Sequence, residues 1–106
     1  MISQTPAPPY YVVIFISVRT EGDNGYAVMS DKMVELAHQQ DGFLGMESAR
    51  SIIGITVSYW RDLDSIRKWR ENTDHIFARE KGRKECYKSF KIRIAKVERD
   101  YEFEWE

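Results

Sequence analysis

Apolar residues recur along this chain with two different periods, and these periods predict an ordered series of strands and helices. Alternating or continuous apolar residues predict four strands, over residues 10–18, 43–51, 54–60 and 90–99. Apolar residues spaced by three and four positions predict helical segments, over residues 26–40, 63–71 and 75–83. The last two segments follow each other in nearly the same direction, so the predicted order is β-α-β-β-α-β.

Local signals between these segments predict their boundaries. Asp62 is expected to cap the second helix, because its carboxylate can accept a hydrogen bond from a free N–H of the first turn. The run Asn72-Thr73-Asp74 predicts a break in that helix, since these side chains compete for backbone hydrogen bonds. The alternation of the last strand slips at Ala95, which predicts a bulge at that position.

This order of elements is typical of the ferredoxin-like arrangement. It is an α+β fold in which a four-stranded antiparallel sheet carries its helices on one face. Residues 10–106 are expected to form one domain with a C-terminal tail, since a chain of 106 residues can bury one modest core. Residues 1–9 contain three prolines and are expected to form an extended lead-in.

The first predicted strand is apolar on both faces, although a sheet with helices on one side needs only one apolar face. On the strands at residues 44–47 and 55–58 the second face is small or mildly polar. The simplest cover is a second copy of the chain, so we predict a homodimer in which two sheets close into a barrel. The alternative is a first strand that is apolar because it is central. The tail residues Tyr101, Phe103 and Trp105 are expected to wrap the partner subunit.

Composition narrows the function classes. The net charge is −1 with both signs interspersed, which argues against a nucleic-acid partner. The longest apolar run, residues 10–16, is too short to cross a bilayer. Residues 1–9 carry no export signal and Cys86 is a single cysteine, so we expect a cytoplasmic protein. Two histidines 37 positions apart match no metal-ligand spacing, and no glycine-rich phosphate loop is present; we therefore predict neither a metal nor another cofactor.

Three segments carry a resemblance to a known family: Gly-Phe-Leu-Gly-Met-Glu at residues 42–47, Gly-Ile-Thr-Val-Ser-Tyr-Trp-Arg at 54–61, and Ile-Arg-Lys-Trp at 66–69. They resemble the antibiotic biosynthesis monooxygenase family, and the likeness extends over roughly residues 10–99. The resemblance implies a dimeric α+β barrel. It also implies one of two activities: cofactor-independent oxygenation of small aromatic or quinol substrates, or degradation of haem.

The haem-degrading branch of this family is characterised by three residues: an Asn on the first strand, a Trp on the second helix and a His ten residues later. Trp69 matches the Trp, including its nine-residue spacing from Trp60. Arg79 stands at the position of the His, and Phe15 lies near the position of the Asn. Because a guanidinium cannot act as a neutral nitrogen ligand to iron, the resemblance implies chemistry other than that of the haem branch.

The two tryptophans are expected to differ in role. Trp60, at the end of a strand, is expected to be structural. Trp69, on the apolar stripe of the second helix, is either a core residue or part of a pocket wall that stacks on a flat substrate. Ser17 and Ser58, on strands, could accept a hydrogen bond from its indole N–H, and we include both with Trp69 among the predicted substrate-binding residues.

Two further side chains are candidates for chemistry. His75 can titrate near neutral pH and is predicted to act as the catalytic general base on a phenolic or quinol proton. The alternative is an exposed histidine without a catalytic role. Arg79, one helical turn later, is predicted to hold an anionic group of the substrate. Its alternative is a solvated arginine that pairs with Glu80 or Asp74.

The sequence therefore predicts a cofactor-independent monooxygenase that binds a small flat aromatic or quinol-type molecule. Two alternatives remain open at this point. One is a haem-binding or haem-degrading oxygenase. The other is a dimer that keeps the fold and binds a ligand without catalysis, since fold alone is a poor guide to function.

Overall fold

The computed structural model describes residues 2–23, 25–80 and 85–105, and for residues 77–80 it describes the backbone alone. The order of elements is the predicted one. The elements are β1 (Tyr10–Arg19), α1 (Tyr26–Gln39), β2 (Phe43–Arg50), β3 (Gly54–Trp60), α2 (Leu63–Glu80) and β4 (Tyr87–Val97). In the part of the chain that the structure describes, no helix is long and apolar enough to cross a membrane.

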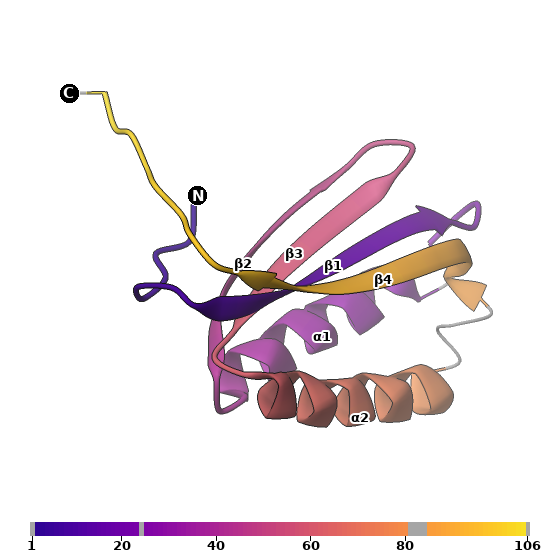
Figure 1. The fold of residues 1–106 in the computed structure, drawn as a ribbon. Helices are drawn as coiled ribbons and strands as arrows, with labels where there is room; N and C mark the ends of the chain where they lie inside the picture. Colours follow the sequence, from indigo (N-terminus) through magenta and orange to yellow (C-terminus); the bar gives the residue numbers. More distant parts are fainter. Residues whose placement is uncertain (1, 24, 81–84, 106) are drawn as a thin grey trace.

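The four strands form one antiparallel sheet in the order β2-β3-β1-β4, and both helices cover the same face of it (Figure 1). This confirms the predicted ferredoxin-like α+β fold. The register places Ser58 of β3 between Val13 of β1 and Met46 of β2, and Val13 is also paired with Ile94 of β4. Because side chains alternate along a strand, these four residues lie on one face of the sheet, the face that the helices cover.

The helix layer is held to the sheet by two separate core clusters. Val13, Trp60 and Ile66 form the cluster where α2 begins, and Trp60 is fully buried. Met29, Ile76 and Cys86 form the second cluster. Ile66 and Ile76 are ten residues apart on α2, which corresponds to roughly 15 Å along the helix axis. The two helices are therefore fixed to the sheet at separated places rather than along one continuous core.

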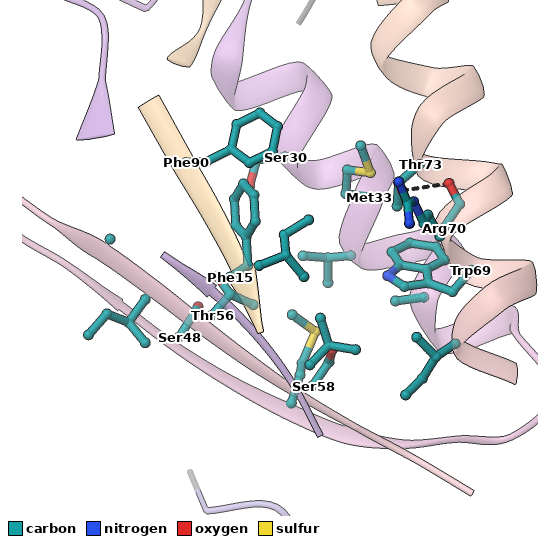
Figure 2. Close-up of a pocket in the computed structure, with 18 of the residues that line it drawn as sticks. Phe15, Ser30, Met33, Ser48, Thr56, Ser58, Trp69, Arg70, Thr73 and Phe90 are labelled. Carbon is teal, nitrogen blue, oxygen red and sulfur yellow. Dashed lines mark hydrogen bonds between the residues drawn. The ribbon is translucent and has the colours of Figure 1, made fainter. Parts of the chain in front are cut away.

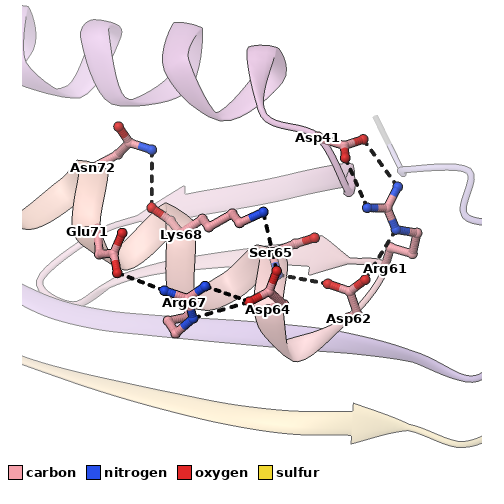
Figure 3. A network of polar contacts seen from close by, with 9 residues as sticks. All are labelled: Asp41, Arg61, Asp62, Asp64, Ser65, Arg67, Lys68, Glu71 and Asn72. Atoms are coloured by element: carbon pink, nitrogen blue, oxygen red, sulfur yellow. Dashed lines mark hydrogen bonds and ion pairs between the residues drawn. The ribbon is translucent and has the colours of Figure 1, made fainter.

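The N-terminus of α2 is capped as predicted. The backbone N–H of Ser65 donates a hydrogen bond to Asp62 Oδ1 over 2.8 Å. A polar network continues along the exposed side of the helix (Figure 3), where Arg67 contacts Asp64 at 2.7 Å and Glu71 at 2.9 Å. These exposed ion pairs are spaced by three and four residues, so they support the helical conformation modestly.

The predicted break at residues 72–74 is wrong, because α2 runs without interruption through this segment to Glu80. The polar side chains there bond within the helix instead of ending it. Asn72 Nδ2 donates to the carbonyl oxygen of Lys68 over 3.1 Å, and Thr73 Oγ1 donates to that of Arg70 over 2.9 Å. The predicted end of this helical segment, at residue 83, lies outside the described residues.

The predicted bulge at Ala95 is also wrong. β1 and β4 keep one register from the pair Tyr10 and Val97 to the pair Val18 and Ser89, and the shift falls at the opposite end, between Val18 and Arg19. The prediction required Val97 to face the helices. In the structure Val97 alternates with Lys96 normally and lies with Ala95 on the far face of the sheet, so no bulge is needed.

Ser58 has a structural task in this fold. Its hydroxyl accepts a hydrogen bond from the indole Nε1 of Trp60 over 2.9 Å. Trp60 is fully buried and Ser58 is 7% exposed, so water has little access to this donor. A buried donor without a partner costs more free energy than the hydrogen bond itself contributes.

We therefore predict that Ser58→Ala lowers the free energy of unfolding by about 1–3 kcal/mol, because the indole N–H of Trp60 loses its acceptor. Urea denaturation measures this change. Ser48→Ala is the matched control: Ser48 is an exposed serine on β2, on the same face of the sheet, and its loss should change the free energy by less than about 0.5 kcal/mol. Equal effects of the two substitutions would contradict the structural role of Ser58.

Candidate functional site

A cavity of about 990 Å³ lies between the helix-covered face of the sheet and the two helices. Figure 2 shows Trp69 on α2 and Met33 on α1 directed into this space, with Phe15 and Ser58 on the sheet side. Its apolar wall is formed by strands and helices together: Val13, Phe15, Met33, Ile66, Trp69, Phe90, Ile92 and Ile94. The cavity wall also carries hydroxyl groups, which belong to Ser30, Ser48, Thr56, Ser58 and Thr73.

Trp69 joins the cavity to the core. Its ring stacks on Trp60 with 5.6 Å between the ring centroids and an interplanar angle of 28°. The side chain of Trp69 is half-buried, and it is one of the cavity-lining residues. Its indole Nε1 makes no hydrogen bond to the part of the chain that the structure describes. Trp69 is thus supported by the core and keeps an N–H donor available to a ligand.

The two predicted serine partners bond elsewhere. Ser58 lines the cavity, and its hydroxyl accepts from Trp60 rather than from Trp69. Ser17 is 1% exposed, and its hydroxyl accepts a hydrogen bond from the guanidinium of Arg50. Each serine therefore supports a side chain of the protein, and a direct contact of either with substrate stays a prediction.

His75 and Trp69 are not brought together. His75 is exposed and is not among the cavity-lining residues, whereas its neighbour Asp74 is. Six residues of α-helix rotate a side chain through roughly 240°, so His75 leaves the helix on a different side from Trp69. The side chain of Arg79 lies outside the described residues. A catalytic role for His75 and a binding role for Arg79 stay predictions.

Arg50 ends β2 and lines the cavity, and the sequence alone assigns it no role. It pairs across the hairpin with Gly54, and Gly54 pairs with Ser17 on β1. The predicted hairpin could have indicated the pairing of Arg50 with Gly54. This pairing places the Arg50 side chain beside a glycine, with the short hydroxyl side chain of Ser17 on the next strand. The ring of Tyr26 lies 5.6 Å from the guanidinium carbon of Arg50.

Aromatic side chains surround this end of the cavity. Phe15, Tyr87 and Phe90 contact one another, with 5.4 Å between Phe15 and each of the other two rings. Burial raises the pKa of Tyr87 well above that of an ordinary phenol, an effect that the nearby Arg50 reduces only in part. The phenol of Tyr87 is therefore neutral over the physiological pH range.

No group of three or more His, Cys, Asp or Glu side chains within the described residues could hold a metal ion. Neither His38 nor His75 lines the cavity, so the described lining residues supply no imidazole. His38 instead bonds the carbonyl oxygen of Val34 through Nδ1, over 2.8 Å.

Solved structures share this fold at low sequence identity. The crystal structure of PA3566 from Pseudomonas aeruginosa has a TM-score of 0.66 and 14% identity, and the match covers 91% of this chain and 99% of that one. SnoaB, a cofactor-independent oxygenase from Streptomyces nogalater, has a TM-score of 0.70 and 8% identity, with 88% of this chain and 97% of that chain covered. These likenesses establish the architecture.

Sequence comparison gives the family. The chain is 51% identical over 105 residues to YqjZ of Bacillus subtilis, which is described as an uncharacterized protein; the match covers 97% of this chain and 92% of YqjZ. Residues 9–81 match the model of the family described as antibiotic biosynthesis monooxygenase. That match includes every element from β1 to the end of α2 and stops before β4. The chain therefore belongs to the antibiotic biosynthesis monooxygenase family.

Proposed function

We propose that this protein is a cofactor-independent monooxygenase that acts on a small flat aromatic or quinol-type substrate. The observation that carries the proposal is the cavity of about 990 Å³ with its largely aromatic and aliphatic wall. This volume lies at the upper end of the range for small-molecule sites and is large enough for fused rings. The shared fold with SnoaB, a cofactor-independent oxygenase, supports the same function.

In this proposal Trp69 positions the substrate. One face of its indole is supported by Trp60, so the ring has little freedom to move aside when a flat molecule packs against it. The free Nε1–H can donate a hydrogen bond to a phenolic or quinol oxygen. A donor at that oxygen stabilises the negative charge that develops when the substrate loses its proton.

The chemistry requires little from the protein beyond binding and proton removal. A deprotonated quinol is electron-rich enough to react with molecular oxygen directly. The substrate supplies the electrons, one oxygen atom enters the product and the other leaves as water. The apolar wall around Phe15, Ile92 and Ile94 excludes water from the reacting anion and from the oxygenated intermediate.

We propose His75 as the proton acceptor on chemical grounds, since the imidazole side chain is the commonest general base in enzymes. A general base must lie within hydrogen-bond reach of the proton or act through one water molecule. The position of His75 beside the cavity-lining Asp74 is compatible with the second arrangement. The haem alternative is not favoured by any feature of the site, because the described lining residues include no histidine.

We predict aerobic conversion of fused-ring quinols or polyphenols by the purified protein in the presence of a metal chelator. With ¹⁸O₂, mass spectrometry should find one labelled oxygen atom per product molecule. Trp69→Ala should lower kcat/KM by about 100-fold, and Trp69→Phe by less, because phenylalanine retains stacking and loses the N–H donor. Val28→Ala is the control, since Val28 is an apolar residue of α1 that is 58% exposed and does not line the cavity.

Conversion that needs added flavin or metal, or product without label, would contradict the proposed function. His75→Ala in the same assay tests the base separately. A loss of about 100-fold would support the role of His75, and unchanged turnover would remove that role while leaving the cavity as the site.

We also propose a homodimer formed through the sheet face away from the helices. Ile14, Ile16 and Val57 lie on this face by strand alternation, and both helices cover the opposite face (Figure 1). An apolar sheet face of this kind is usually covered by a partner. In the tail, Tyr101 and Trp105 are almost fully exposed, which supports the proposal that the tail wraps the partner subunit.

We predict that the protein sediments as a dimer at micromolar concentration and that Ile16→Glu converts it to a monomer, because a buried carboxylate would be left unpaired in the interface. Val28→Glu, on the 58%-exposed Val28 of α1, introduces the same charge away from the proposed interface and should leave the dimer intact. A monomeric native protein, or a dimer that persists in Ile16→Glu, would contradict the proposed interface.

A further inference from the structure

One end of the cavity is lined by Arg50 together with aromatic side chains. We propose that the substrate is an aromatic carboxylate, or an equivalent planar aromatic anion, whose charged group binds to Arg50. This inference rests on the proposed function and makes the substrate class more specific. Three features of Arg50 support this proposal. Two small residues leave room for its guanidinium and fix its position, which we call the seat. Its charge has no carboxylate partner among the described residues, and aromatic side chains surround it.

Two small residues, Gly54 and Ser17, form the seat of the Arg50 guanidinium. A Cβ atom at Gly54 would fall directly on the guanidinium of Arg50, so the absence of a side chain there is what allows the guanidinium to lie against the strand. On the next strand, the buried hydroxyl of Ser17 accepts a hydrogen bond from Arg50. One donor of the guanidinium is thus fixed by the protein, and its remaining donors stay available.

The charge of Arg50 is not balanced by a carboxylate within the described residues. The cavity has two other arginines, and both have acidic partners. Arg67 contacts Asp64 and Glu71, and Arg70 lies 3.9 Å from Asp74. Arg50 instead contacts the hydroxyl of Ser17 and the ring of Tyr26. An anionic ligand would therefore meet, at this end of the cavity, a cation without a carboxylate partner among the described residues.

The aromatic surrounding indicates what the anion is attached to. Tyr26 and Tyr87 contact edge to face at 5.9 Å, and Tyr87 in turn contacts Phe15 at 5.4 Å. All three line the cavity together with Arg50. A planar ring can pack among these side chains while its carboxylate accepts two parallel hydrogen bonds from the guanidinium, the geometry that arginine and carboxylate favour.

The test uses two probes of equal shape, 2-naphthoate and its neutral analogue 2-naphthamide, with binding measured by isothermal titration calorimetry. The native protein should bind 2-naphthoate about tenfold more tightly than 2-naphthamide, because the carboxylate adds charge-assisted hydrogen bonds. In Arg50→Gln the two affinities should become equal, through weaker binding of 2-naphthoate alone. Gly54→Ala should reduce the preference while keeping the charge, because the new Cβ displaces the guanidinium from its seat.

Arg61→Gln is the matched control. It removes the same charge at an exposed arginine that pairs with Asp41 and does not line the cavity, so the preference for 2-naphthoate should persist. Equal affinities in the native protein, or a preference that survives in Arg50→Gln, would overturn the role of Arg50 and leave the proposed function standing. If neither probe binds the native protein, both proposals fail.

Discussion

The stacking of Trp69 on Trp60 is the contact on which the rest of the site depends. Trp60 is fully buried at the end of β3, and its indole N–H is fixed by Ser58 on the same strand. The ring of Trp69, on α2, rests on it with 5.6 Å between centroids. This contact fixes the beginning of α2 to the sheet. It also means that one face of Trp69 belongs to the core and the other to the cavity.

The cavity follows from the way the helix layer is attached. One cluster, around Trp60 and Ile66, holds α2 near its beginning, and the other, around Met29 and Ile76, holds both helices further along. The space between helices and sheet is not filled by a continuous core. The site therefore combines a stacking platform at Trp69 with the guanidinium of Arg50, and the proposed recognition of an aromatic carboxylate rests on these two features.

The elements that could be predicted from the sequence are those whose apolar period is regular. β3 was predicted to the residue, and α1 to within one residue, because one buried stripe defines each of them. The break in α2 was wrongly predicted, since the sequence does not show whether the side chains of Asn72 and Thr73 bond inside or outside the helix. The bulge at Ala95 failed because β4 belongs to a sheet with apolar residues on both faces.

The candidate site could be predicted only in part, because several of its contacts depend on residues that are far apart in the sequence. Trp69 could be identified because helical spacing places it on the apolar stripe. Ser58 was offered as one of two possible partners of Trp69, whereas its hydroxyl accepts a hydrogen bond from Trp60, the more deeply buried of the two indoles. Arg50 could not be assigned a role from the sequence, because its contacts arise from the hairpin register with Gly54 and from Ser17 on a third strand. Such cross-strand relations are not visible in local sequence.

The most direct test of this account is an ¹⁵N-resolved NMR spectrum of the three tryptophan indole N–H groups, recorded during titration with 2-naphthoate. The account predicts a Trp60 signal that is protected from hydrogen exchange by Ser58 and moves little on titration. The Trp69 signal should exchange rapidly and shift as the cavity fills, while that of exposed Trp105 stays unchanged. A protected Trp69 signal that does not respond to the ligand would contradict the claim that this residue is the ligand-facing half of the pair.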